Sequence, residues 1–235
     1  MIRYSFFLIL VIYPFIISYT PQSNSNIISA TLKVQKASNG KKITIESEVL
    51  YFIDKKEIRM HYTSPDEFIF ISNILGETKL YFPKKNEVLI QQKDVFSAET
   101  DILFLFFTQN MSEMGLKNIG FQIISTKAEG DYLITKWSSP MGSKSVSEIE
   151  LVYNDYVPIY TSFISSANKP LNKTYYGNYT EFKGNYIPLR ITEITYLATG
   201  DSIVSRKDYS DLKFGNQVQT YLLNFKIPNN AKVVK

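Results

Sequence analysis

Apolar and polar residues alternate along most of the chain after its first 26 residues. This two-residue period is typical of β-strands with one buried face. Turn signals separate the alternating runs, beginning with Ser38, Asn39 and Gly40 after the first run. The pattern predicts six short antiparallel strands before the middle of the chain, over residues 28–36, 42–53, 57–63, 67–71, 78–82 and 87–91.

The period changes to that of a helix over residues 97–114. Ser97 is a suitable N-cap, Asp101 lies in the first turn, where the helix dipole favours a carboxylate, and Gly115 is a suitable stop. Residues 102–107 are consecutively apolar, so the helix has little polar surface there. Such a helix must be buried on most sides or must cover an apolar surface.

Alternating runs resume after this helix. They predict further strands over residues 121–126, 131–137, 147–153, 159–165, 173–182, 186–197, 202–212 and 221–227. Neither a linker nor an internal repeat interrupts the pattern. We therefore expect a mainly β fold: an open antiparallel β-barrel, or half-barrel, of about 11 strands covered by a short α-helical lid.

The first residues follow a different pattern. Arg3 gives a cationic start, residues 5–17 are almost wholly apolar, and residues 18–26 are small and polar. This is the layout of a secretory signal peptide, with cleavage expected near Asn26. The apolar run is shorter than the roughly 20 residues of a transmembrane helix, although an uncleaved anchor is the alternative. We expect residues 1–25 to be a signal peptide and residues 26–235 to form a single exported domain.

Composition limits the chemistry available to this chain. There is no cysteine and only one histidine, His61, so a thiolate or histidine-rich metal site is not expected. The net charge of +4, without a clustered run of Lys and Arg, is weak evidence for nucleic-acid binding. We expect no metal, no cofactor and no nucleic-acid partner.

Two patterns resemble catalytic motifs, and neither is complete. The string GDSI at 200–203 is similar to the nucleophile motif of GDSL-type esterases, but no histidine follows it to act as a base. Glu148 and Glu150 share one strand face, as the two carboxylates of a glycosidase could. A solvated strand face is the simpler interpretation of that pair. We therefore expect that the protein is not an enzyme.

The remaining candidate site is apolar surface. Ile58, Met60 and Tyr62 share one strand face, whereas Arg59 and His61 point to the other. The helix adds large and adaptable side chains that could cover a ligand. The candidate ligand-binding residues of the wall and lid are Ile58, Met60, Tyr62, Leu103, Phe106, Phe107, Met111 and Met114. A filled core is the alternative interpretation of the same residues.

The stretch KKEIRMHYTSPDEF at 55–68 resembles the periplasmic outer-membrane lipoprotein carrier family, LolA. LYFP at 80–83, the predicted helix and the closing stretch NFKIPNNAKVV at 224–234 are similar to the same family. The resemblance implies a carrier that binds the acyl chains of lipoproteins, or other lipids, in a hydrophobic cavity and shuttles them toward the outer membrane. It also implies a periplasmic monomer whose partners are an inner-membrane release complex and an outer-membrane acceptor.

Two departures from the family accompany this resemblance. The family holds its lid closed with an arginine whose place here falls on Asp54 and Lys55. Lys55 would be a weak substitute for that arginine, because lysine lacks the planar guanidinium fork. The two candidate latch residues are Lys55 and Arg59. The family also opens with an amphipathic helix, where residues 28–36 here predict a strand. The alternative to a carrier is a non-catalytic envelope-assembly or structural β module with a filled core.

Overall fold

The computed structural model describes residues 26–92, 101–108, 111–140, 146–182 and 185–234. The predicted signal peptide at 1–25 lies outside the described residues. One sheet dominates the rest of the chain, and its strands lie in the order β14-β6-β5-β4-β3-β2-β1-β13-β12-β11-β10-β9-β8-β7. The strands are β1 (Ile27–Ser38), β2 (Lys41–Phe52), β3 (Glu57–Ser64), β4 (Phe68–Asn73), β5 (Glu77–Phe82), β6 (Glu87–Gln92), β7 (Gln122–Glu129), β8 (Tyr132–Ser138), β9 (Glu148–Asn154), β10 (Val157–Ile164), β11 (Pro170–Phe182), β12 (Asn185–Tyr196), β13 (Ser202–Phe214) and β14 (Lys232–Val234).

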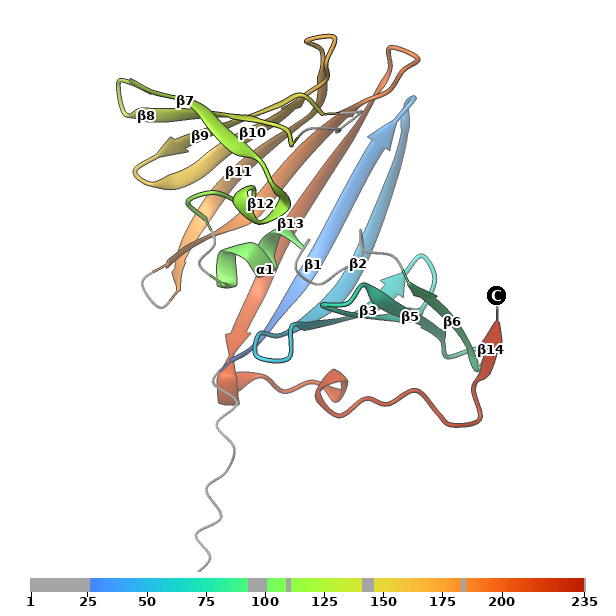
Figure 1. The fold of residues 1–235 in the computed structure, drawn as a ribbon. Coiled ribbons are helices and arrows are strands. Elements are labelled where there is room, and N and C mark those ends of the chain that lie inside the picture. The colour runs from blue at the N-terminus through green and yellow to red at the C-terminus, as the bar shows by residue number, and fades with distance from the viewer. Residues whose placement is uncertain (1–25, 93–100, 109–110, 141–145, 183–184, 235) are drawn as a thin grey trace, which may run out of the picture.

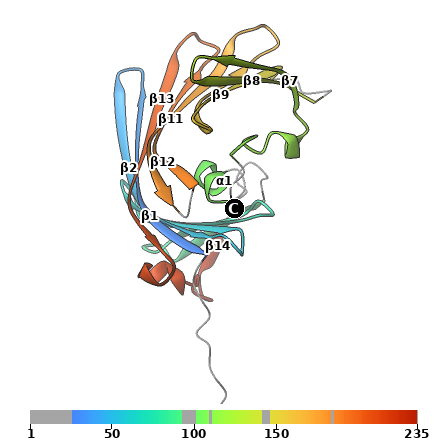
Figure 2. The same cartoon turned by 90° about the vertical axis from the view of Figure 1, so that its left-hand side faces the viewer.

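The sheet curls around a short helix, α1 (Ile102–Phe107), and does not close on itself (Figures 1 and 2). Within the described ranges it has 14 strands, more than the roughly 11 that the sequence predicted. Every neighbouring pair is antiparallel except β14 with β6, which is parallel. The prediction of a mainly β, open half-barrel with a short helical lid is confirmed.

The central hairpin shows how the alternating sequence forms this sheet. In β1, Ile28, Leu32 and Val34 are buried on the concave side, the side that faces α1. Ser38 pairs with Lys41 across a two-residue turn. Asn39 and Gly40 form that turn, with φ of 48° and 73°, which suits Asn and Gly in a tight hairpin. The described part of the chain therefore begins with a strand, as the pattern of residues 28–36 predicted.

Helix α1 is shorter than the predicted helix over residues 97–114. Asp101 is its N-cap, and the carboxylate accepts a hydrogen bond from the backbone N–H of Phe104 at 3.1 Å. At the other end, Thr108 is the C-cap, and its backbone N–H and its hydroxyl both donate to the carbonyl of Phe104, at 3.0 Å and 2.9 Å. Met114 and Gly115 both have positive φ, which a continuous helix excludes. The predicted N-cap, Ser97, lies outside the described residues.

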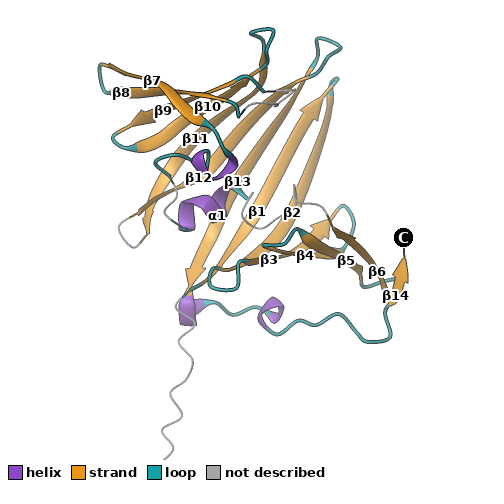
Figure 3. Ribbon diagram, viewed as in Figure 1, coloured by secondary structure: helices purple, strands orange, loops and turns teal. Residues whose placement is uncertain are grey.

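The C-terminal segment, residues 215–231, does not form the strand predicted over 221–227. It crosses the convex face of the sheet as an irregular chain with two short 3₁₀ turns, η4 (Gly215–Gln217) and η5 (Tyr221–Leu223), as Figure 3 shows. Val218 and Leu222 are buried against convex-side residues of the sheet, so its apolar positions reflect packing onto a face. A third 3₁₀ turn, η3 (Lys117–Ile119), precedes β7.

Apolar layers cover both faces of β2. Val49 and Tyr51 point to α1, whereas Leu50 and Phe52 point to the C-terminal segment, because successive side chains of a strand alternate. All four are buried. None of the helices in the described ranges has the length and apolar character needed to span a bilayer.

Candidate functional site

Helix α1 inserts its apolar side chains into the concave side of the sheet. Leu103 and Phe106 are 0% exposed, and Phe104 is 2% exposed. The ring of Phe106 lies 5.9 Å from that of Tyr176 on β11, and the ring of Phe107 lies 5.2 Å from that of Tyr51 on β2. The helix therefore fills part of the interior and joins strands from both halves of the sheet.

A cavity of about 730 Å³ lies beside α1. Its walls come from β3 and β4 on one side and from β9 to β13 on the other, with the α1 region and residues 114–119 between them. The lining residues are Ile58, Met60, Phe70, Ser72, Asp101, Leu105, Met114, Gly115, Leu116, Ile119, Leu151, Thr161, Phe163, Asn172, Thr174, Tyr176, Ile191, Glu193 and Lys207.

The cavity wall is divided chemically. The β3 and β4 side is mainly apolar, as at Ile58 and Met60, but β10 to β13 contribute polar groups. Asn172 donates a hydrogen bond to the carboxylate of Glu193, and the hydroxyl of Thr174 donates to the side-chain oxygen of Asn172 at 3.0 Å. The sequence predicted an apolar interior and named no polar residue in it. In the structure, polar residues of β11, β12 and β13 also line the cavity.

Asp101 joins α1 to the sheet. Its Oδ1 atom accepts the capping bond from Phe104 and a second bond from the Tyr51 hydroxyl at 3.3 Å. Burial and the nearby Asp101 charge raise the pKa of Tyr51 well above its ordinary value, so this hydroxyl keeps its proton at neutral pH. The same two causes raise the pKa of Tyr209 beside it. Sequence analysis assigned Asp101 only to the first helical turn and missed this tether.

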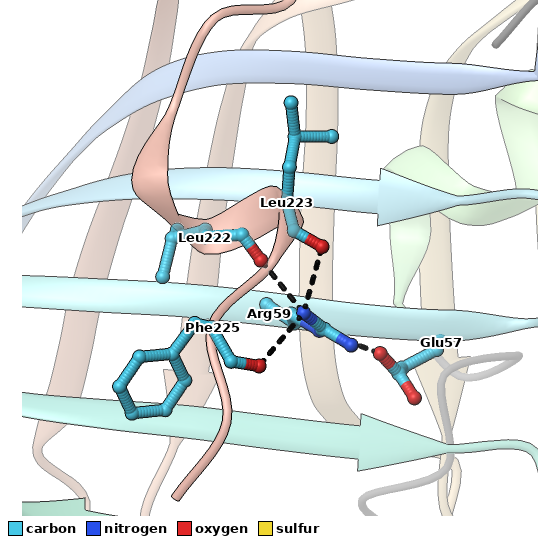
Figure 4. Close-up of polar contacts among 5 residues, drawn as sticks. All are labelled: Glu57, Arg59, Leu222, Leu223 and Phe225. Atoms are coloured by element: carbon cyan, nitrogen blue, oxygen red, sulfur yellow. Dashed lines mark hydrogen bonds and ion pairs between the residues drawn. The ribbon is translucent and has the colours of Figure 1, made fainter.

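The two candidate latch residues lie elsewhere. Arg59 points to the convex face, where its Nη1 donates to the carbonyls of Leu222 at 2.7 Å and of Leu223 and Phe225 at 3.3 Å (Figure 4). Its Nε donates to Glu57 at 2.6 Å. Within the described chain, Arg59 thus holds the C-terminal segment, on the face opposite α1.

Lys55 is exposed in the β2–β3 turn. Its Nζ lies 5.0 Å from the centre of the Phe52 ring, which the Arg59 guanidinium also covers at 4.7 Å. Phe52 belongs to the convex apolar layer. The structure therefore places both candidate latch residues beside the convex layer, and Asp101 is the polar residue that connects α1 to the sheet.

The eight residues predicted for the wall and lid share one apolar cluster on the concave side. Ile58, Met60 and Met114 line the cavity itself. Leu103 and Phe106 are buried behind it. The other three pack around this cluster as partly buried residues: Tyr62, Phe107 and Met111. Met111 also borders a second cavity of about 640 Å³, with Tyr153 and Tyr156 among its other lining residues.

Sequence analysis missed the cavity residues on the later strands. Among them are Leu151, Phe163, Tyr176 and Ile191, with the polar Asn172, Glu193 and Lys207. Their alternation was visible and showed which of them share a strand face. It did not show which face is concave, because that depends on how the whole sheet curls.

The two catalytic-looking patterns are engaged in other contacts. Ser202 of the GDSI string begins β13 at a hairpin turn and pairs with Tyr196. His61, the histidine that such a serine would need as a base, bonds to Glu67 at 3.3 Å. Lys136 contacts Glu148 at 3.0 Å and Glu150 at 3.7 Å, so the carboxylate pair neutralises a lysine. The described residues contain no cluster of three or more His, Cys, Asp or Glu that could hold a metal ion.

Comparison with solved structures identifies the fold of this curved, open sheet with its cavity and short helix. A LolA superfamily protein from Nitrosomonas europaea matches with a TM-score of 0.57 and 15% identity, covering 86% of this chain and 91% of that one. An outer membrane lipoprotein-sorting protein domain from Vibrio parahaemolyticus matches with a TM-score of 0.56 and 14% identity, covering 85% and 89%. A DUF1329 family protein from Desulfovibrio piger matches with a TM-score of 0.57 and 11% identity, covering 83% and 88%.

The chain has a LolA-like fold, and the resemblance seen in the sequence is confirmed at that level. No family model matches the sequence, and no curated protein matches it. The identities of 11–15% establish the fold and leave the cargo to be argued from the site.

Proposed function

We propose that this protein is a periplasmic carrier that binds the acyl chains of lipoproteins, or of other lipids, and shuttles them toward the outer membrane. The observation that carries the proposal is the cavity of about 730 Å³ beside an apolar helix, in a fold shared with an outer membrane lipoprotein-sorting domain. Sites for small molecules typically enclose about 300–1,000 Å³. The cavity is therefore large enough for part of an acyl chain before any movement of α1.

The packing of α1 supplies a means of release. Burying an acyl chain yields about 0.8 kcal/mol for each methylene, so a long chain would bind too tightly to leave an open apolar groove. Leu103, Phe104 and Phe106 occupy interior space next to the cavity. Because these side chains and an acyl chain compete for the same apolar interior, closure of α1 offsets part of the binding energy. A carrier needs this balance between uptake and release.

The remaining parts of the proposal rest on the pattern of the first residues and on the resemblance to the LolA family. Residues 1–25 would direct export, and the mature chain would work as a monomer. It would receive cargo from an inner-membrane release complex and give it to an outer-membrane acceptor, without a cofactor and without catalysing a reaction. The LolA-like neighbours support this general theme of lipoprotein transport.

The direct test is uptake of cis-parinaric acid, a fatty acid that fluoresces in apolar surroundings, by the mature protein. Leu105→Asp places a carboxylate on the cavity wall and should weaken binding at least about tenfold, because the charge must lose water when a chain enters. Leu75→Asp is the matched control, since Leu75 is 70% exposed on the β4–β5 turn. The absence of probe binding at micromolar protein would refute the carrier proposal.

One observation favours a second candidate, a structural envelope module. The side chains of Leu103 and Phe106 are fully buried, as in a permanently filled core. In that case α1 would stay in place in the presence of lipid, and neither aspartate variant would differ from the wild type in probe fluorescence. Hydrogen exchange of the α1 amides with and without lipid separates the two candidates.

A further inference from the structure

The cavity contains one positively charged side chain, Lys207, among its described lining residues. Lys207 lies on β13, opposite Val34 of β1 and Ile191 of β12, so its cross-strand neighbours are apolar. It is half-buried. An ammonium group held in such surroundings loses part of its hydration, and this loss favours a negatively charged partner.

The protein does not supply that partner within the described ranges. No carboxylate there lies within 4.0 Å of the Lys207 ammonium, although Glu193 lines the same cavity. The Glu193 carboxylate is engaged by Asn172 and by Thr195 at 3.3 Å. Elsewhere on β13, Arg206 bonds to Asp208 at 2.9 Å, so the unpaired state of Lys207 is not a general property of the strand.

The apolar wall lies across the same cavity. Ile58 and Met60 belong to β3, which β2 and β1 separate from β13 in the sheet, and Leu105 projects from α1. The cavity thus presents hydrocarbon on one wall and a free ammonium on another. A ligand that matches both walls carries an apolar chain and an anionic group.

We infer that the cavity selects acyl chains that bear an anionic head group, a carboxylate or a phosphate monoester, and that Lys207 binds this head group. The inference rests on the proposed function and names the ligand class of the same cavity. Other polar residues of the lining, among them Thr174 and Asn172 on β11, add hydrogen-bonding groups to the same cavity. Neutral acyl chains would enter the same space without this contact.

The experiment compares cis-parinaric acid with its methyl ester, which has the same chain and no charge. Wild-type protein at neutral pH should bind the acid about five- to tenfold more tightly, the range expected for a charge-assisted contact that water still reaches. Lys207→Met should remove this preference and leave ester binding within about twofold of wild type. Lys42→Met, an exposed position of β2 outside the cavity lining, makes the same change of net charge and should keep the preference.

A second pair of ligands distinguishes the head groups. Lysophosphatidic acid and lysophosphatidylcholine of equal chain length compete for the bound methyl ester. If lysophosphatidic acid competes more strongly than lysophosphatidylcholine, Lys207 binds a phosphate. If the two compete equally and only cis-parinaric acid is preferred over its ester, Lys207 binds a carboxylate. Equal affinity of the wild type for acid and ester would overturn the inference while the carrier proposal stands. Failure of both probes to bind would refute the carrier proposal, and the inference with it.

Discussion

Truncation of Phe106 separates a lid from an ordinary core helix, because the two roles predict opposite effects on ligand binding. Phe106 is fully buried on α1, where its ring lies 5.9 Å from Tyr176 and 6.3 Å from Tyr179. Phe106→Ala removes this ring from the interior and leaves the backbone of α1 unchanged. The closed protein loses packing, and the space that the ring occupied becomes available to a ligand.

The magnitude follows from the burial. Replacing a fully buried Phe by Ala costs about 3–5 kcal/mol, part of it from the cavity that remains. Small proteins have about 5–15 kcal/mol of stability in total, so the variant should still fold. If ligand binding requires α1 to move outward, the same free energy no longer opposes binding. Each 1.4 kcal/mol changes a dissociation constant about tenfold, so about 3 kcal/mol, the lower end of this range, corresponds to a gain in affinity of about a hundredfold.

Two measurements test this reasoning. Urea unfolding gives the free energy of the variant without ligand, which we expect to fall by about 3 kcal/mol. Titration with methyl cis-parinarate gives the affinity, which we expect to rise. Leu50→Ala is the matched control, because Leu50 is equally buried but faces the convex layer. It should lower stability by a similar amount and leave affinity unchanged.

The result that refutes the reasoning is a destabilised Phe106→Ala protein with unchanged or weaker binding. In that case α1 does not compete with the ligand, and the helix is a fixed part of the core.

Three further predictions concern the contacts that hold α1, the C-terminal segment and the buried tyrosines. Arg59→Ala should lower the free energy of unfolding by about 2–3 kcal/mol and expose the C-terminal segment to proteases. The control, Arg190→Ala, removes a largely exposed ion pair and should do neither. Equal proteolytic cleavage of the two variants would contradict the role of Arg59. Asp101→Ala should speed hydrogen exchange of the α1 amides more than Tyr51→Phe does. It removes both the N-cap, worth about 1 kcal/mol, and the hydrogen bond from the Tyr51 hydroxyl, whereas Tyr51→Phe removes only the second. Unchanged exchange in Asp101→Ala would show that Asp101 does not hold α1 in place. Burial raises the pKa of Tyr176 from 10.0 to about 12, so the unfolded chain loses this proton first and the free energy of unfolding should fall as the pH rises from 10 to 12. Tyr176→Phe should make that fall shallower by about 1.4 kcal/mol per pH unit. Equal slopes for the two proteins in urea unfolding would argue against this role of Tyr176.

Local patterns predicted most of the sheet. The hairpin at Asn39 and Gly40 and the alternation of β1 were legible because turn residues and a two-residue period act over short distances. The prediction of a strand over residues 221–227 was wrong, although these residues alternate in the same way as a strand. Those residues pack on a sheet face instead, and a periodic pattern cannot distinguish a neighbouring strand from a neighbouring face.

The candidate site was predictable only in part. The apolar character of 102–107 and the shared face of Ile58 and Met60 indicated a buried helix over an apolar wall. The sequence did not reveal the tether from Asp101 to Tyr51, since 50 residues separate the two partners. Nor did it reveal that Lys207 lines the cavity of Ile58, because this depends on two intervening strands and on the curvature of the sheet.

The sequence by itself determined the class of fold, the apolar helix and the faces that its strands present. These follow from the preferences of each residue for its near neighbours and for burial. Only the tertiary structure decided which face is concave, where the helix ends and which charged groups face each other. Curvature and contacts of this kind arise when the whole sheet curls around α1, so they are properties of the assembled chain and of no single stretch within it.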